Sequence, residues 1–154
     1  MAKTLPFSGN TQATRARAAK TMLLPLPRAT ADELALQTHL ALDSLGRGQG
    51  SVGAAQTVTQ AMVLAGFIAE AGYGKLPPEV FRAADAASAT CFERGRACGE
   101  WMLDQAGFEA FAAVVTAYDQ QLQKAPLWAL TEASDRLARF QAGEPYQAVN
   151  RKRA

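Results

Sequence analysis

Residues 46–53, GRGQGSVG, contain the spacing G-x-G-x-x-G at Gly48, Gly50 and Gly53. In a dinucleotide-binding fold, such glycines let the backbone approach a pyrophosphate at a helix N-terminus, and an acidic residue about 20 positions later, here Glu70, binds the ribose. That chemistry requires a β-strand directly before the glycines. The preceding residues carry a helical pattern instead, so we interpret the glycines as a helix–helix connection. The alternative is a phosphate-binding loop at the N-terminus of the helix that follows, where backbone N–H groups attract anions.

His39 is the single histidine, so acid–base or metal chemistry near neutral pH would depend on it. Asp43 lies four residues later, where its carboxylate could orient or charge the imidazole. The pair suggests a small ligand-binding or catalytic bundle organised around His39 and Asp43, as the alternative to a non-enzymatic protein. Catalysis needs further converging groups, and the sequence has no Glu-x-x-His of a di-iron bundle. We therefore predict no catalytic residue, no metal site and no cofactor.

Cys91 and Cys98 lie seven residues apart in a segment with a helical pattern. A helical rise of 1.5 Å per residue separates their Cα atoms by about 10 Å, too far for a disulfide or a shared zinc ion. We interpret both as buried small hydrophobic residues. Reduced thiols fit the cytoplasm, and the early apolar run Met22–Leu24 is cut by Pro25, unlike a secretory signal. We expect a cytoplasmic protein.

The elements that carry these residues are expected to be helices. Of the 154 residues, 49% are apolar and 19% charged, alanine is frequent, and β-branched residues are sparse. We predict an all-α protein with a single five-helix up-down bundle, residues 30–143, between flexible basic arms, residues 1–29 and 144–154. The uncharged stretch 48–69 is long enough for a bilayer but carries Gln and Thr, so it predicts a central buried helix and no membrane contact.

Capping residues and spacing set the expected helix bounds at 30–45, 51–71, 78–103, 104 or 107 to 124, and 126–143. Thr30 and Ser51 are expected N-caps, and Gly46 a left-handed C-cap. The third helix repeats mostly small side chains at alternating spacings of three and four, and the fourth repeats large ones, which predicts a close antiparallel pair. The small series is Phe81, Ala84, Ser88, Cys91, Gly95, Cys98 and Met102, and the large one is Phe108, Phe111, Val115, Tyr118 and Leu122.

The basic residues gather at the two ends of the sequence. Residues 32–144 hold eight basic and fourteen acidic residues, a net charge of −6, between ends that carry +5 and +3. We predict that these arms contact nucleic acid or another polyanion; solubilising tails, an organelle transit peptide, a protein partner and a homodimer remain alternatives. The candidate contact residues are Lys3, Arg15, Arg17, Lys20, Arg28, Arg151, Lys152 and Arg153.

The segments LPLPR, LALQTHLALDSLGRGQGS and WMLDQAGFEAFAAVVTAYDQQL resemble a group of small helical β-proteobacterial proteins labelled Fis-family transcriptional regulators. The similarity covers most of residues 23–143 and consists of helical core and cap residues. It implies a DNA-bending homodimer with a helix-turn-helix near the C-terminus. The sequence departs from that pattern, because only eleven residues follow Gly143 and Pro145 is among them. We expect a non-enzymatic helical interaction module, DNA-associated through its basic arms.

Overall fold

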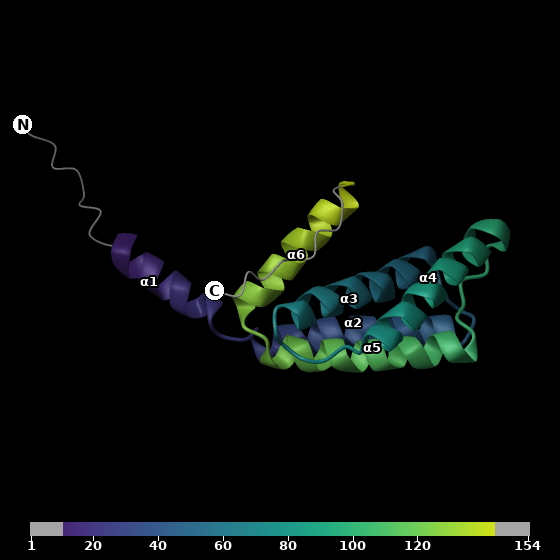
Figure 1. Ribbon diagram of the computed structural model, residues 1–154, viewed down its shortest axis with the longest axis horizontal. Coiled ribbons are helices and arrows are strands. Elements are labelled where there is room, and N and C mark those ends of the chain that lie inside the picture. The colour runs from purple at the N-terminus through teal and green to yellow at the C-terminus, as the bar shows by residue number, and fades with distance from the viewer. Residues whose placement is uncertain (1–10, 144–154) are drawn as a thin grey trace, which may run out of the picture.

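The computed structural model describes residues 11–143, and every regular element in that range is an α-helix. The all-α prediction is confirmed, but six helices form where five were expected (Figure 1). The helices are α1 (Thr11–Met22), α2 (Arg28–Gly46), α3 (Val52–Glu70), α4 (Pro78–Cys98), α5 (Gln105–Lys124) and α6 (Leu127–Gln141).

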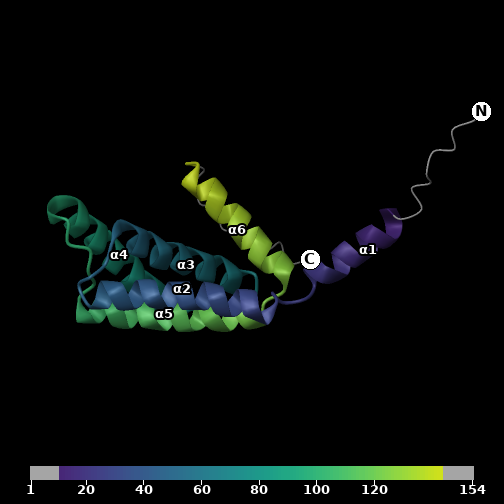
Figure 2. The ribbon, with the colours of Figure 1, turned by 180° about the vertical axis from the view of Figure 1, so that it is seen from behind.

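Helices α2 to α5 form a four-helix bundle in which consecutive helices run in opposite directions (Figures 1 and 2). Helix α3 is central and packs against α2, α4, α5 and α6. It is long and apolar enough to cross a membrane by length and composition alone. Seven of its 19 side chains, Met62 and Ile68 among them, are buried in the core.

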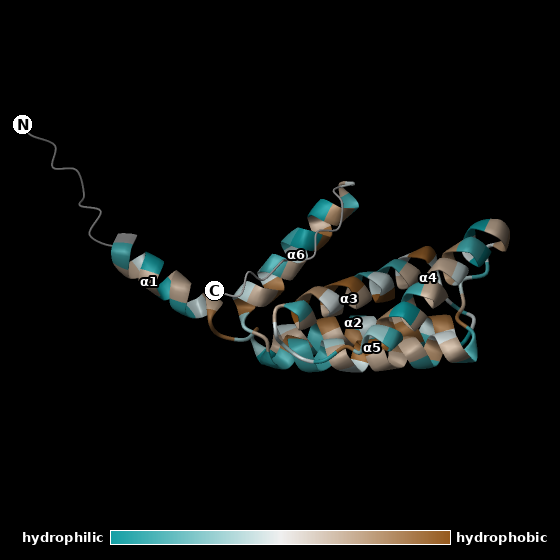
Figure 3. Ribbon diagram, viewed as in Figure 1, coloured by the Kyte–Doolittle hydropathy of each residue, from teal (hydrophilic) through white to brown (hydrophobic). Residues whose placement is uncertain are grey.

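Helix α1 contradicts the prediction of a flexible arm over residues 1–29 in the part that the structure describes. Its residues are mostly Ala, Arg, Lys, Gln and Thr, and alanine, arginine, lysine and glutamine are good helix formers that need no apolar stripe. Figure 3 shows the difference, since α1 mixes teal and pale brown, whereas α3 includes deep-brown segments. The helix was missed because hydrophobic periodicity reports only helices that have a buried face.

The caps around α2 and α3 follow the prediction only in part. Ser51 caps α3 as expected, since its side-chain oxygen accepts a hydrogen bond of 3.1 Å from the Ala54 N–H. Helix α2 begins at Arg28, directly after the extended Pro27, so Thr30 lies inside its first turn and caps nothing. The left-handed residue in the following loop is Gly48, with φ 71°, and not Gly46.

The predicted pairing of α4 with α5 is confirmed. Ala84, Ser88 and Cys91 on α4 are buried, as are Phe111 and Val115 on α5. The predicted length of α4 was wrong, because the helix ends at Cys98 and not at residue 103. Gly99 stops it with a left-handed φ of 74° and an N–H that donates to the Gly95 carbonyl at 2.9 Å.

The segment after α4 folds back onto the end of the bundle. The Leu103 N–H donates to the Leu45 carbonyl at 3.1 Å, and both side chains are buried. Trp101 lies against α4, where its ring meets Phe92 edge-on at 5.5 Å between centroids. A Cβ atom on Gly95 would overlap this ring, so the glycine is required by a tryptophan and not by a second helix.

Helix α6 diverges from the bundle and rests on α3 alone among the four bundle helices, apart from weaker contacts. The start of α6 lies beside the end of α1, where the Leu127 N–H donates to the Leu24 carbonyl at 2.7 Å. An isolated β-bridge joins Pro25 to Pro126 at the same place. Two helices therefore project from one end of the bundle (Figure 2).

Candidate functional site

Helix α1 carries three of the predicted nucleic-acid contacts on a segment that projects from the bundle (Figures 1 and 2). Arg15, Arg17 and Lys20 are all exposed, and the helix contains no acidic residue. Arg17 and Lys20 are three residues apart and share one side of the helix, while Arg15 lies on the opposite side. The cations therefore surround the helix and are not confined to one face.

Arg28 lies at the first turn of α2 rather than in the arm. Its Nε is 3.9 Å from the Asp32 carboxylate, with side chains 93% and 59% exposed. Such an exposed pair contributes little to stability. The other predicted contacts, Lys3, Arg151, Lys152 and Arg153, lie outside the described residues.

The structure gives His39 and Asp43 different partners. His39 Nε2 lies 3.7 Å from the Asp119 carboxylate on α5. The Asp43 carboxylate accepts a hydrogen bond of 3.1 Å from Arg47 on its own helix. The predicted interaction of His39 with Asp43 is therefore wrong, because the histidine points across the α2–α5 contact rather than along α2.

The glycine-rich loop connects α2 to α3, as predicted, and no β-strand precedes it within residues 11–143. Gly50 lies so close to the backbone of Trp101 that a Cβ atom on Gly50 would overlap the Trp101 carbonyl oxygen. Glu70, the residue in the position of a ribose ligand, lies at the opposite end of α3, where it pairs with Arg136 at 3.0 Å. The loop thus has a packing role, and the groups of a dinucleotide site do not converge on it.

The two cysteines differ in environment. Cys91 is buried as predicted, and burial raises the pKa of its thiol. Cys98 is exposed, contrary to the prediction, because α4 ends there and its last turn extends beyond the bundle; its thiol donates to the Arg94 carbonyl at 3.2 Å. Among the described residues, no three His, Cys, Asp or Glu side chains are grouped as metal ligands.

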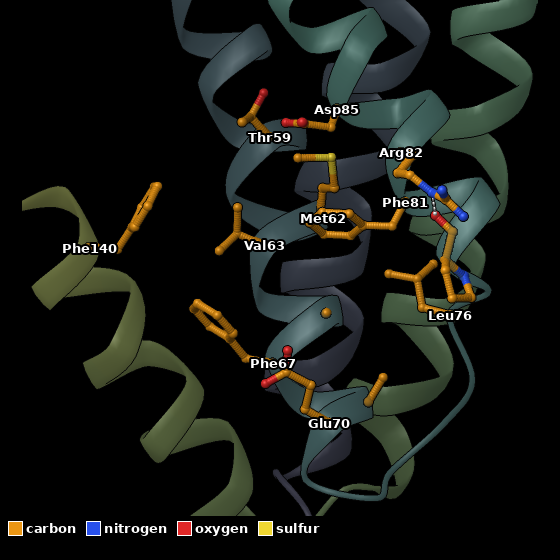
Figure 4. A pocket seen from close by; sticks show the side chains of 13 residues that line it. Thr59, Met62, Val63, Phe67, Glu70, Leu76, Phe81, Arg82, Asp85 and Phe140 are labelled. Carbon is orange, nitrogen blue, oxygen red and sulfur yellow. Dashed lines mark hydrogen bonds between the residues drawn. The ribbon is translucent and has the colours of Figure 1, made fainter. Parts of the chain in front are cut away.

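A wide groove between α3, α4 and α6 was not predicted. Its volume is about 780 Å³, and apolar side chains form most of its walls (Figure 4). The walls include Met62, Val63, Phe67, Leu76, Phe81 and Phe140, with Thr59, Glu70, Arg82 and Asp85 as the polar contributors. The groove exists because α6 leans away from α4, which leaves the α3 surface between them uncovered.

An ion pair fixes α6 to the floor of this groove. Arg136 Nη1 donates to Glu70 Oε2 at 3.0 Å, and only 11% of the Arg136 side chain is exposed. The same guanidinium stacks over the Phe67 ring at 3.9 Å from its centroid. Sequence spacing could not reveal this contact, because the charged partners are 66 residues apart.

Comparisons with known proteins found no match, whether to a family model, to a curated protein or to a solved structure. The resemblance to proteins labelled as Fis-family regulators therefore stays a prediction from the sequence. The two candidate sites therefore rest on geometry alone. They are the projecting cationic helix α1 and the apolar groove between α3, α4 and α6.

Proposed function

We propose that the protein is a non-enzymatic helical interaction module that contacts nucleic acid through its basic ends. The observation that carries the proposal is α1, a projecting helix with three exposed cations and no carboxylate. The bundle itself carries an excess of acidic residues and repels phosphate, so binding would be directed to the ends.

The expected mode is contact with the phosphate backbone. Lysine and arginine on phosphates displace condensed counterions, which gives affinity without sequence information. Arg15, Arg17 and Lys20 lie on different sides of α1, so they suit a path of phosphates around the helix better than a set of base edges in one groove. We therefore propose binding with little sequence preference.

A salt titration with duplex DNA tests this function. The intact protein should bind at low salt, and log affinity should fall against log salt by about 0.9 for each phosphate contact. The variant R15Q/R17Q/K20Q should bind more weakly and with a shallower slope. Its matched control is K75Q/R94Q/K124Q, which removes the same charge from exposed positions of the bundle and should bind like the parent.

Two results would contradict the proposal. Absence of binding by the intact protein at low salt would leave the cations as solubilising groups. Equal losses in the two triple variants would show that net charge, and not α1, determines binding. The alternative of a ligand-binding or catalytic bundle around His39 and Asp43 has no support from their geometry, since the two side chains have separate partners.

A further inference from the structure

The groove between α3, α4 and α6 has the size and composition of a site for a small molecule. Its volume of about 780 Å³ lies within the range of about 300–1,000 Å³ for such sites, and most of its walls are apolar. We propose that the groove binds an amphiphilic organic cation, with the apolar body of the ligand along α3 and its ammonium group at Asp85. The inference does not depend on nucleic-acid binding.

The middle of the groove offers a surface for the apolar body. Met62 lies on its floor on α3, Phe81 lies beside Met62 from α4, and Phe140 lies on the α6 side (Figure 4). Phe140 is 49% exposed, so its ring has area that a ligand can cover. Thr59 and Glu70, both in the wall, are eleven residues apart on α3, which corresponds to a groove about 16 Å long.

One end of the groove carries a carboxylate without a counter-ion. Figure 4 shows the Asp85 side chain extending from α4 toward Thr59 on α3. Among residues 11–143, the Asp85 carboxylate takes part in no hydrogen bond or ion pair. The nearest cation along α4, Arg82, points away from it, and its Nε donates to the Pro78 carbonyl at 3.3 Å. The Asp85 carboxylate is therefore available to an ammonium group.

The opposite end of the groove is already neutralised. Glu70 pairs with Arg136 at 3.0 Å, and the same guanidinium lies over the Phe67 ring at 3.9 Å from its centroid. Within the protein itself, an aromatic ring and a carboxylate of this groove thus hold a cation between them. A ligand cation is directed to the other end, where Asp85 has no such partner, so the ligand has one preferred orientation.

NMR titration of the full-length protein tests the proposal. The probes are decylammonium, 1-decanol and decanoate, which share an alkyl chain and differ in charge, each kept below the concentration at which it forms micelles. We expect saturable shifts of the Met62 and Val63 amide signals. The signal of Leu40, which is exposed on α2 and does not line the groove, should stay in place. Decylammonium should bind about fivefold more tightly than 1-decanol, as for an exposed ion pair, and decanoate most weakly.

Substitutions separate the charge from the apolar surface. Asp85→Asn should lower the affinity for decylammonium to that for 1-decanol and leave 1-decanol binding unchanged. Glu93→Gln removes the same charge from an exposed position of α4 outside the groove, so it should keep the preference for decylammonium. Phe140→Ser should weaken binding of all three probes. The three variants should share the remaining amide spectrum of the parent, which verifies that the bundle is folded.

Several outcomes would overturn the inference. Equal affinity for the three probes, or a preference for decylammonium that survives Asp85→Asn, would show that this carboxylate does not select the ligand. Tightest binding of decanoate would assign the selection to a cation such as Arg82. Groove signals that respond to no probe would show that the groove is not a site for such ligands. Groove signals that move when the probe-free protein is diluted would show that a second copy of the chain covers it.

Discussion

The contact between Gly95 and Trp101 allows one substitution to be worked through in magnitude. Alanine in place of glycine inside a helix normally stabilises by about 0.8–1 kcal/mol, since the backbone loses less freedom on folding. Here the added Cβ would overlap the Trp101 ring, which is itself fixed edge-on against Phe92. Overpacking of this kind costs about 1–3 kcal/mol, more than the propensity gain. Because the added Cβ would overlap three atoms of the ring, the cost falls in the upper part of this range, and after subtraction of the propensity gain Gly95→Ala should destabilise the protein by about 1–2 kcal/mol.

Urea unfolding measures this change, with a matched helical glycine as control. Gly53 lies in the first turn of α3, where a Cβ atom would meet only the Ser51 oxygen at 3.7 Å, so Gly53→Ala should be neutral or stabilising. In a Trp101→Ala background the clash is gone, and Gly95→Ala should become stabilising. A Gly95→Ala protein as stable as the parent, or a penalty that persists without Trp101, would refute the assigned contact.

Two further predictions concern side chains at the groove and at the end of α4. Arg136→Ala should lower the free energy of unfolding by about 1–2 kcal/mol in urea melts, since it removes the Glu70 ion pair, weakened by solvent screening, and the contact with Phe67; an unchanged value would show that α6 does not depend on this pair. Cys98 should react with iodoacetamide in the folded protein while Cys91 does not, as mass spectrometry of tryptic peptides would show. Equal labelling of both thiols would contradict the burial of Cys91.

The sequence predicted the four helices of the bundle well because each of them has a buried face, but it wrongly placed α6 in the bundle as a fifth helix. Heptad spacing on α4 and α5 identified the residues that meet, and the Ser51 cap located the start of α3. The same method extended α4 too far, since the spacing continues to Met102 although Gly99 ends the helix. Cys98 was misassigned for that reason, because it lies past Gly95, the last buried residue of α4.

The features beyond the bundle could not be predicted from periodicity. Helix α1 has no buried face, so only its composition marks it as helical. The groove depends on the angle at which α6 leaves the bundle, and its walls come from residues as distant as Val63, Phe81 and Phe140. His39 met Asp119 because α2 and α5 pack together, which spacing within α2 does not report.

The hydrogen bond between Leu127 and Leu24 joins the two linkers from which α1 and α6 project. Helix α6 is already held on α3 by packing and by the Arg136–Glu70 ion pair. Helix α1 has no more than weak contacts with the four bundle helices and packs instead against α6. The direction in which α1 projects is therefore set by the start of α6, through the Leu127–Leu24 hydrogen bond of 2.7 Å and the Pro25–Pro126 bridge beside it.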